Sequence, residues 1–283
     1  MNRTDSRTWG ALAAALSALG FATLSLWGKF APLVGLNIPT FLAWRFALTT
    51  LALLWFVPKS IAASERWRQI AFGGAYIVQT LIYFTALQQT SASVASLLLY
   101  LAPAFVVLYE WGLKSPPSKA QLLGLALASL GLVVIVGLPS PSDGTLLGFG
   151  LAGLSGACYG GFLVASGRLF PHADSVSLTA HAGFGSASGL VALGLATRSL
   201  SVPSSLEAWG VVLGAVVFST VLAIPLMFRA TQLLGATTAS LLLTLEPLFV
   251  VGLALVFLGE GLSVSKAIGG ALILAGALLA QRR

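Results

Sequence analysis

A set of tyrosine, serine and glutamine side chains recurs at helical spacing in an otherwise apolar sequence. Tyr76, Gln79 and Tyr83 lie at i, i+3 and i+7, so a helix carries them on one face. Ser96 and Tyr100, four residues apart, share a face of the next predicted helix. Aromatic rings stack against apolar or aromatic groups, while hydroxyl and amide groups pair with an ammonium or a carboxylate. These residues therefore favour recognition of a small molecule.

Two charged residues lie inside predicted apolar runs. Glu246 is near the centre of its run, where an ionised and isolated acid would cost about 2.5–3.5 kcal/mol. It must pair with a partner, bind a proton or face water. Two roles are therefore compatible with the sequence: proton coupling and a structural ion pair. In a continuous helix Glu246 would point away from the face that carries the serine and threonine side chains of its span, unless Pro247 distorts that helix. Arg45 either pairs with a carboxylate, attracts a substrate carboxylate or snorkels outward.

The residue types that catalysis needs are not grouped in the sequence. Cys158 is the single cysteine, and His172 and His181 have no cysteine or carboxylate at ligand spacing, so we expect no metal site. A nucleophile with its base, a carboxylate pair and a phosphate-cradling loop are also missing. The sequence therefore predicts no enzyme, no cofactor and no ATP-driven transport.

The composition places these residues in a membrane protein. Of the 283 residues, 57% are hydrophobic and 8% are charged, against about 25% charged residues in soluble domains. So few charges cannot cover the surface of a water-soluble enzyme of this length. The fold class expected is all-α and integral to the membrane.

Ten apolar runs are long enough, or nearly so, to cross a bilayer as helices, which takes about 20 residues. The first is kept as a span because it is too long for a signal-peptide core. The runs are 9–29, 40–57, 67–88, 91–113, 119–137, 145–167, 175–197, 207–233, 236–258 and 263–280.

The basic residues predict the orientation of these helices. With the N-terminus in the cytoplasm, 11 of the 15 lysines and arginines fall on the cytoplasmic side. The even number of spans returns the C-terminus to the same side. The net charge of +7 is therefore a topology signal and not a sign of nucleic-acid binding. We expect a multi-pass protein of the bacterial inner membrane with both termini in the cytoplasm.

An internal repeat is visible. The run Tyr83–Val107 aligns without gaps to Met227–Val251, with 14 of 25 positions identical. Spans three and four thus correspond to eight and nine, which predicts two five-helix domains, 1–140 and 141–283. Because five is odd, the second copy must be inverted in the membrane. Inverted repeats are a recurring plan of secondary transporters, although a duplicated scaffold without a transport role is the alternative.

The repeat also relates the candidate site residues. Tyr83 corresponds to Met227, and Tyr100 corresponds to Thr244, so a symmetric scaffold diverges where it would touch an asymmetric molecule. Ser96 corresponds to Ser240, and the alternative for these hydroxyl groups is that they only join closely packed helices. Three prolines inside the repeat-related spans are either hinges or static kinks. They are Pro103, Pro225 and Pro247.

Three sequence features carry a resemblance to a known family. They are the run Leu241–Pro247, the turn Gly259–Gly261 and the cluster Trp44–Phe46. With them the chain resembles the drug/metabolite transporter superfamily, in particular its EamA-type members with five plus five helices. The first repeat departs from the pattern, because Ala102 replaces an acidic residue and Lys114 lies near the place of the turn glutamate. Members export amino acids, drugs and other metabolites, and the resemblance implies such an activity.

The resemblance and the tyrosines together predict a secondary transporter that exports amino acids with apolar or aromatic side chains. Resemblance to the bacterial aromatic amino-acid exporters supports this choice. Transport would proceed by alternating access around a central cavity between helices three, four, eight and nine. The expected partners are a small-molecule substrate and membrane lipid, with a functional monomer and an oligomer left open. The alternatives are export of cationic drugs or purine-type metabolites, a facilitator-like channel, and an integral-membrane enzyme.

Overall fold

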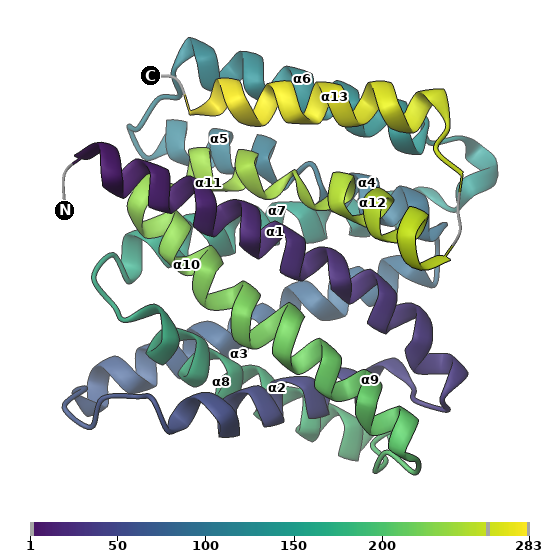
Figure 1. Cartoon of the computed structure of the whole chain (residues 1–283). Coiled ribbons are helices and arrows are strands. Elements are labelled where there is room, and N and C mark those ends of the chain that lie inside the picture. The colour runs from purple at the N-terminus through teal and green to yellow at the C-terminus, as the bar shows by residue number, and fades with distance from the viewer. Residues whose placement is uncertain (1–2, 259–260, 282–283) are drawn as a thin grey trace. The chain divides into compact units, whose positions relative to one another are not determined.

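The computed structural model describes residues 3–258 and 261–281. These residues are almost entirely α-helical (Figure 1). Among them, 8 helical segments are long and apolar enough to cross a membrane, and two shorter apolar helices, Ile38–Leu54 and Val264–Ala280, accompany them. These segments coincide with the ten predicted runs, so the expected ten-helix, all-α membrane fold is confirmed.

The chain forms two compact units, and each unit draws on separate stretches of the sequence. Unit 1 comprises Met1–Ala18, Gln79–Pro171 and Met227–Arg283, and unit 2 comprises Leu19–Val78 and His172–Leu226. Three helices contribute residues to both units. They are α1 (Arg3–Leu33), α3 (Ala63–Leu87) and α10 (Ala223–Leu234).

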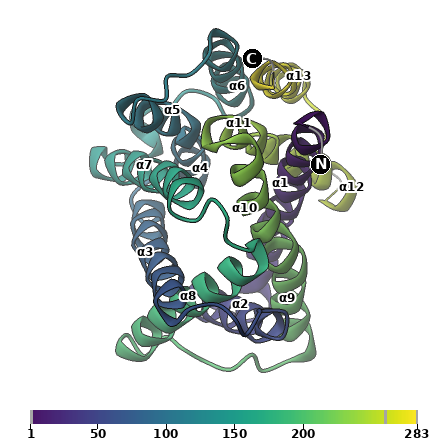
Figure 2. The ribbon, with the colours of Figure 1, turned by 90° about the vertical axis from the view of Figure 1, so that its left-hand side faces the viewer.

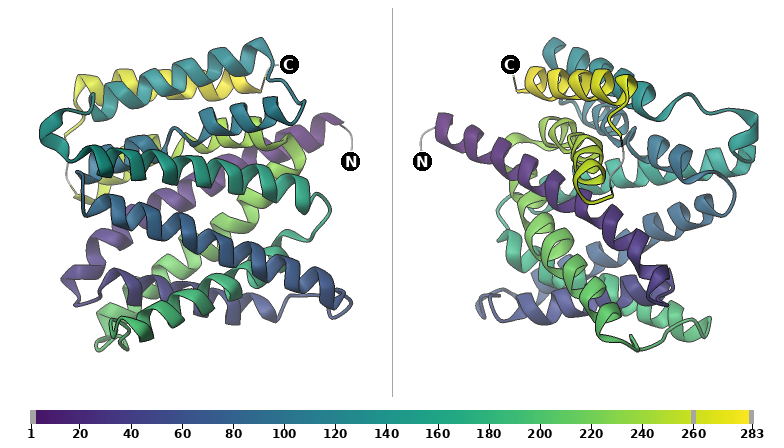
Figure 3. Two further views of the ribbon diagram at one scale, coloured as in Figure 1. Left: turned by 180° about the vertical axis from the view of Figure 1, so that it is seen from behind. Right: turned by 45° about the vertical axis from the view of Figure 1, so that its right-hand side comes forward.

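Unit 1 holds most of the candidate site residues. Its remaining helices are α4 (Ala92–Leu99), α5 (Ala102–Gly112), α6 (Lys119–Val136), α7 (Leu146–Leu169), α11 (Ala236–Leu243), α12 (Glu246–Leu258) and α13 (Val264–Ala280), with a 3-10 turn, η1, at Pro141–Asp143. The helices α6 and α13 lie side by side in opposite views of the ribbon (Figures 1 and 3). Helices α4 and α5 pack against α7.

Glycines bring these helices of unit 1 into backbone contact. A Cβ atom on Gly131 of α6 would lie 2.5 Å from the carbonyl oxygen of Gly269 in α13. One on Gly160 of α7 would lie 2.9 Å from the carbonyl oxygen of Ala102. Small residues allow this approach, which suits helices that associate in lipid by close packing.

Unit 2 contains α2 (Ile38–Leu54), α8 (Ser175–Ala196), α9 (Leu206–Val216) and the π-helical stretch η2 (Val217–Leu222). The helices α2 and α8 pack together, as the turned view shows (Figure 2). The first half of α3 also packs on α8, where Ser186 donates a hydrogen bond to the carbonyl oxygen of Gly73 at 2.9 Å.

Polar side chains fix where several helices begin. The Asn37 side chain accepts a hydrogen bond from the backbone of Thr40 at the start of α2. Ser118 and Gln121 form a reciprocal capping box at the start of α6. Asp174 caps α8 in the same way as Asn37. Such caps satisfy backbone donors that have no partner within the helix, and they explain why the helix starts agree closely with the apolar runs.

Candidate functional site

The predicted spans four and nine are not continuous helices. The first is divided into α4 and α5 at residues 100–101, and the second into α11 and α12 at residues 244–245. The prolines explain both breaks, because a proline removes the hydrogen bond to the carbonyl group four residues earlier. For Pro103 and Pro247 that residue is Leu99 and Leu243, the last residue of α4 and of α11. Each proline is therefore preceded by a two-residue interruption of its helix, at equivalent positions of the repeat.

The two breaks are joined by a side-chain contact within unit 1. The Tyr100 hydroxyl group donates a hydrogen bond to Glu246 Oε1 at 3.1 Å. Tyr100 caps the C-terminal end of α4, and Glu246 opens α12. The chain turns at residues 244–245, directly before Glu246, so the distortion considered for Pro247 is present.

Tyr83 and Ser96 are also brought together. Their hydroxyl oxygens lie 3.3 Å apart, which joins the end of α3 to α4. Beneath them Ala86, Ala95 and Ala152 form a buried apolar cluster against which Tyr83 packs. Electrostatic interactions further link the Tyr100 hydroxyl group to Tyr83, Tyr159 and Glu246.

Two residues of α7 belong to the same neighbourhood, and the sequence reasoning missed both. The Gln79 amide nitrogen donates to Ser155 Oγ at 2.9 Å. The Tyr159 hydroxyl group lies 3.6 Å from Met227 Sδ. The signal was present, because Ser155 and Tyr159 are spaced at i and i+4 in the run 145–167.

We call the residues joined by these contacts the unit 1 cluster. Its side chains come from α3, α4, α7, α10 and α12, so five helices position it. Gln79 and Met227 are buried, at 6% and 2% exposure. The members are Gln79, Tyr83, Ser96, Tyr100, Ser155, Tyr159, Met227 and Glu246.

The hydroxyl groups of α11 are used differently. Ser240 donates to the carbonyl oxygen of Thr237 at 3.0 Å, and Thr244 donates to that of Leu241 at 2.6 Å. Hydroxyl groups that bond to their own helix satisfy their donors locally. Neither of these bonds reaches another helix, and a substrate role of Ser240 and Thr244 stays a prediction.

Tyr76 and Arg45 belong to unit 2. The Tyr76 ring meets Phe46 edge-on at 6.1 Å between centroids. Arg45 is 4% exposed, and its guanidinium group lies 5.0 Å from the centroid of the Phe46 ring. Its Nε donates to Thr220 Oγ1 at 2.6 Å, and its Nη2 donates to the carbonyl oxygen of Ser219 at 3.0 Å. Arg45 thus turns into its unit and does not snorkel outward.

The π-helical stretch η2 explains how Arg45 is accommodated. A π-helix widens the turn and changes which carbonyl groups remain for side chains to bond. Thr220 Oγ1 donates to the carbonyl oxygen of Ala215, five residues earlier, while it accepts from Arg45. Pro225 lies near the start of α10, directly after η2. The proline thus follows an irregular stretch, as Pro103 and Pro247 do.

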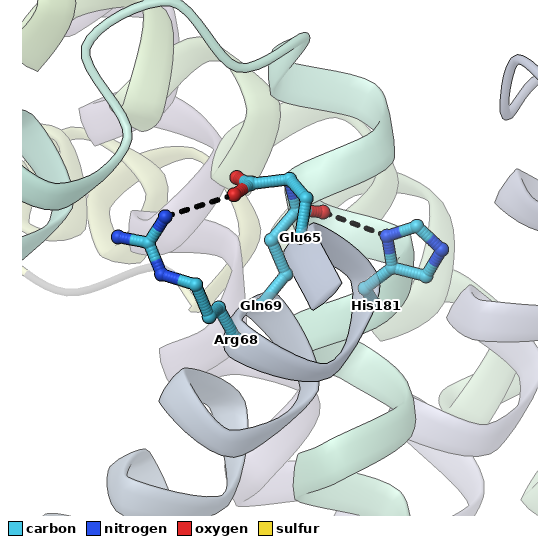
Figure 4. Close-up of polar contacts among 4 residues, drawn as sticks. All are labelled: Glu65, Arg68, Gln69 and His181. Atoms are coloured by element: carbon cyan, nitrogen blue, oxygen red, sulfur yellow. Dashed lines mark hydrogen bonds and ion pairs between the residues drawn. The ribbon is translucent and has the colours of Figure 1, made fainter. Parts of the chain in front are cut away.

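A second set of polar side chains in unit 2 connects α3 to α8 (Figure 4). Gln69 Nε2 donates to Glu65 Oε1 at 3.1 Å, so its oxygen is left to pair with His181 Nδ1 at 2.7 Å. Arg68 Nη1 lies 3.1 Å from Glu65 Oε2. His181 is therefore not the isolated residue that its sequence context suggested.

Glu110 of α5 and Arg168 of α7 form an ion pair in unit 1. Arg168 Nη2 lies 2.6 Å from Glu110 Oε2, and Arg168 Nε lies 3.2 Å from Oε1. Two parallel contacts of this kind are geometrically specific and tie the ends of the two helices together.

Comparison with known proteins adds to this geometry. The model of the EamA-like transporter family matches residues 8–137 and again residues 146–281. The chain is 26% identical over 268 residues to the uncharacterized transporter YcbK of Bacillus subtilis, over 88% of this chain and 85% of that protein. It is 28% identical over 275 residues to an uncharacterized transporter of Archaeoglobus fulgidus, over 97% of each chain.

A crystal structure of a protein that is 22% identical in sequence matches the fold with a TM-score of 0.79 over 96% of each chain. Three sequence features carried the resemblance to this family, and one of them is the turn Gly259–Gly261. Its residues Gly259 and Glu260 lie outside the described residues. The other two lie on α2 and on α11 with the start of α12. The family match covers nearly the whole chain, so this multi-pass membrane transporter belongs to the EamA-like transporter family, within the drug/metabolite transporter superfamily.

Proposed function

We propose that this transporter exports amino acids with apolar or aromatic side chains and that the unit 1 cluster contacts the substrate. The observation that carries the proposal is the hydrogen bond from Tyr100 to Glu246 between two broken, repeat-related helices. Discontinuous helices of this kind form substrate sites in secondary transporters. A carboxylate inside the membrane is costly and marks a functional position.

The residue types of the cluster suit such a substrate. The tyrosine rings offer apolar faces to a side chain of the substrate, worth about 0.5–1.5 kcal/mol for a stacked aromatic pair beyond burial. Gln79, Ser96 and Ser155 offer hydrogen bonds to the polar part of an amino acid. A dianionic substrate such as a sugar phosphate fits poorly, because it needs arginine or lysine clamps.

The mechanism we propose is alternating access by two inverted five-helix repeats, residues 1–140 and 141–283. The breaks near Pro103 and Pro247, with the π-helical stretch before Pro225, are the hinges of this motion. Helix ends that lack continuous backbone hydrogen bonds bend at lower cost than regular helices. We propose a location in the inner membrane, with both termini in the cytoplasm because the distribution of basic residues favours that orientation.

A counterflow experiment tests the proposal. Purified protein is reconstituted in liposomes loaded with an unlabelled solute, and entry of the same radiolabelled solute is followed. We expect transient, saturable accumulation of phenylalanine, tyrosine, tryptophan or leucine. Accumulation of only quaternary amines, or of only purines, would show that these compounds and not amino acids are the substrates. Conductance without counterflow would show that the protein is a channel and not a carrier.

A further inference from the structure

Three tyrosines from three helices accompany Glu246 in the unit 1 cluster. Glu246 accepts the hydrogen bond from Tyr100 of α4 at 3.1 Å. Tyr83 of α3 and Tyr159 of α7 interact electrostatically with the same Tyr100 hydroxyl group. A weaker electrostatic interaction also links Tyr83 to Glu246. The Tyr100 hydroxyl group therefore lies within electrostatic range of one carboxyl group and of two further tyrosines inside unit 1.

The neighbouring contacts orient these side chains. Ser96 holds the Tyr83 hydroxyl oxygen at 3.3 Å, and Met227 lies 3.6 Å from that of Tyr159. Glu246 occupies the first turn of α12, where the positive end of the helix dipole stabilises a negative charge. The cluster thus combines a carboxylate at a helix start with aromatic rings whose hydroxyl groups are already positioned.

We propose that Glu246, Tyr83, Tyr100 and Tyr159 form the subsite for the positively charged ammonium group of the transported molecule. A carboxylate gives an ammonium group a charge-assisted hydrogen bond, and the faces of tyrosine rings attract the same cation. A free carboxylate or phosphate group is repelled by Glu246 at this position. The inference rests on the proposed function and narrows it: an ammonium group is required, and a carboxylate is not.

The chemistry yields a defined set of probes for direct binding. Phenethylamine carries the ring and the ammonium group, 3-phenylpropionate carries the ring and the carboxylate, and N-acetyl-L-phenylalanine has its nitrogen neutralised. Binding of each to the purified protein is measured by the thermal shift it causes, since a ligand of the native state raises the apparent melting temperature. We expect L-phenylalanine and phenethylamine to stabilise the protein and the other two probes to cause no shift.

Two sets of variants test the residues. Glu246→Gln should weaken phenethylamine binding about tenfold or more, because a charge-assisted bond is lost. Glu207→Gln, which alters an exposed acid at the start of α9, is the matched control and should bind as the unaltered protein does. If Glu246→Gln does not fold, phenethylamine binding by Tyr159→Leu and Tyr159→Phe provides a second test. Leucine should weaken binding about three- to tenfold, while phenylalanine keeps the aromatic face and the affinity.

The outcomes separate this inference from the proposed function. Equal binding of 3-phenylpropionate and phenethylamine, no binding of any probe, or unchanged binding by Glu246→Gln and Tyr159→Leu would overturn the ammonium subsite. If amino acids then still show counterflow, the proposed function stands without it. If phenethylamine binds through Glu246 but no amino acid is transported, the subsite stands and the substrate becomes an amine.

Discussion

Tyr100 closes α4, Glu246 opens α12, and the hydroxyl group of the first donates to the carboxyl group of the second across 3.1 Å. In the repeat, Tyr100 corresponds to Thr244, and Glu246 corresponds to Ala102. The first half of the chain provides Tyr100 and the second half provides Glu246. Neither residue is repeated at the corresponding position of the other half. The two interruptions occur at equivalent positions of the backbone, and their side chains differ.

The hydrogen bond between Tyr100 and Glu246 can be removed without removing the ring. Tyr100→Phe should raise the Km of counterflow about tenfold, because a hydrogen bond to a charged group contributes about 1.5–3 kcal/mol. Tyr109→Phe is the matched control. Tyr109 lies on α5, and its hydroxyl group donates to the carbonyl oxygen of Ala157. Equal Km values for the two variants would show that the contact has no part in substrate binding.

Inverted repeats place equivalent loops on opposite sides of the membrane. Ser60 and Ser204 are both exposed, and each lies in the loop before the first of the two repeat-related spans of its half. In a Cys158→Ser background, Ser60→Cys should react with a membrane-impermeant thiol reagent only after cells are opened, and Ser204→Cys should react in intact cells. Labelling of both positions from the same side would mean that the repeats run parallel.

The contact between α6 and α13 depends on glycine. Gly131→Ala should lower the stability by about 1–3 kcal/mol, because the added Cβ meets the carbonyl oxygen of Gly269 at 2.5 Å. Gly150→Ala is the control, since a Cβ there has nothing within 4 Å. It should be neutral or stabilise α7 by about 0.4–1 kcal/mol. Melting of the purified proteins in detergent compares the two, and an unchanged melting temperature for Gly131→Ala would contradict the packing.

The pair of Glu110 and Arg168 can be tested by exchanging the charges. The side chains are 12% and 39% exposed, so we expect the ion pair to contribute about 1 kcal/mol. Glu110→Arg and Arg168→Glu should each lower the melting temperature, because each places like charges together. The double variant should recover most of the loss. If the double variant is as unstable as the sum of the two, the residues do not interact in the membrane protein.

Much of the fold follows from hydropathy, because a helix must be apolar over its length to cross lipid. The capping residues Asn37, Ser118 and Asp174 mark helix starts that a reader of the sequence can find. The prolines at 103 and 247 predict distortion, although whether a proline kinks a helix or ends it depends on what satisfies the freed carbonyl groups. That depends on packing and is not a local property of the sequence.

The candidate site was predicted in part. Tyr83, Ser96 and Tyr100 were expected to share a site, and their contacts fall within unit 1. Ser155 and Tyr159 were missed because their span lies outside the aligned stretches of the repeat, residues 83–107 and 227–251. The inward turn of Arg45 could not be read from the sequence, since it depends on a π-helical stretch for which the sequence has no clear local signal.

The occupancy of the unit 1 cluster is tested most directly by protection of a single cysteine. Ser96 is half-buried and contacts Tyr83, so Ser96→Cys in the Cys158→Ser background places a thiol of similar size in the cluster. Ser142→Cys, in an exposed turn, is the control. We expect L-phenylalanine to slow methanethiosulfonate labelling at position 96, at the concentrations that saturate transport, and to leave position 142 unaffected. Labelling of position 96 at an unchanged rate while transport is saturated would contradict a substrate site at the cluster.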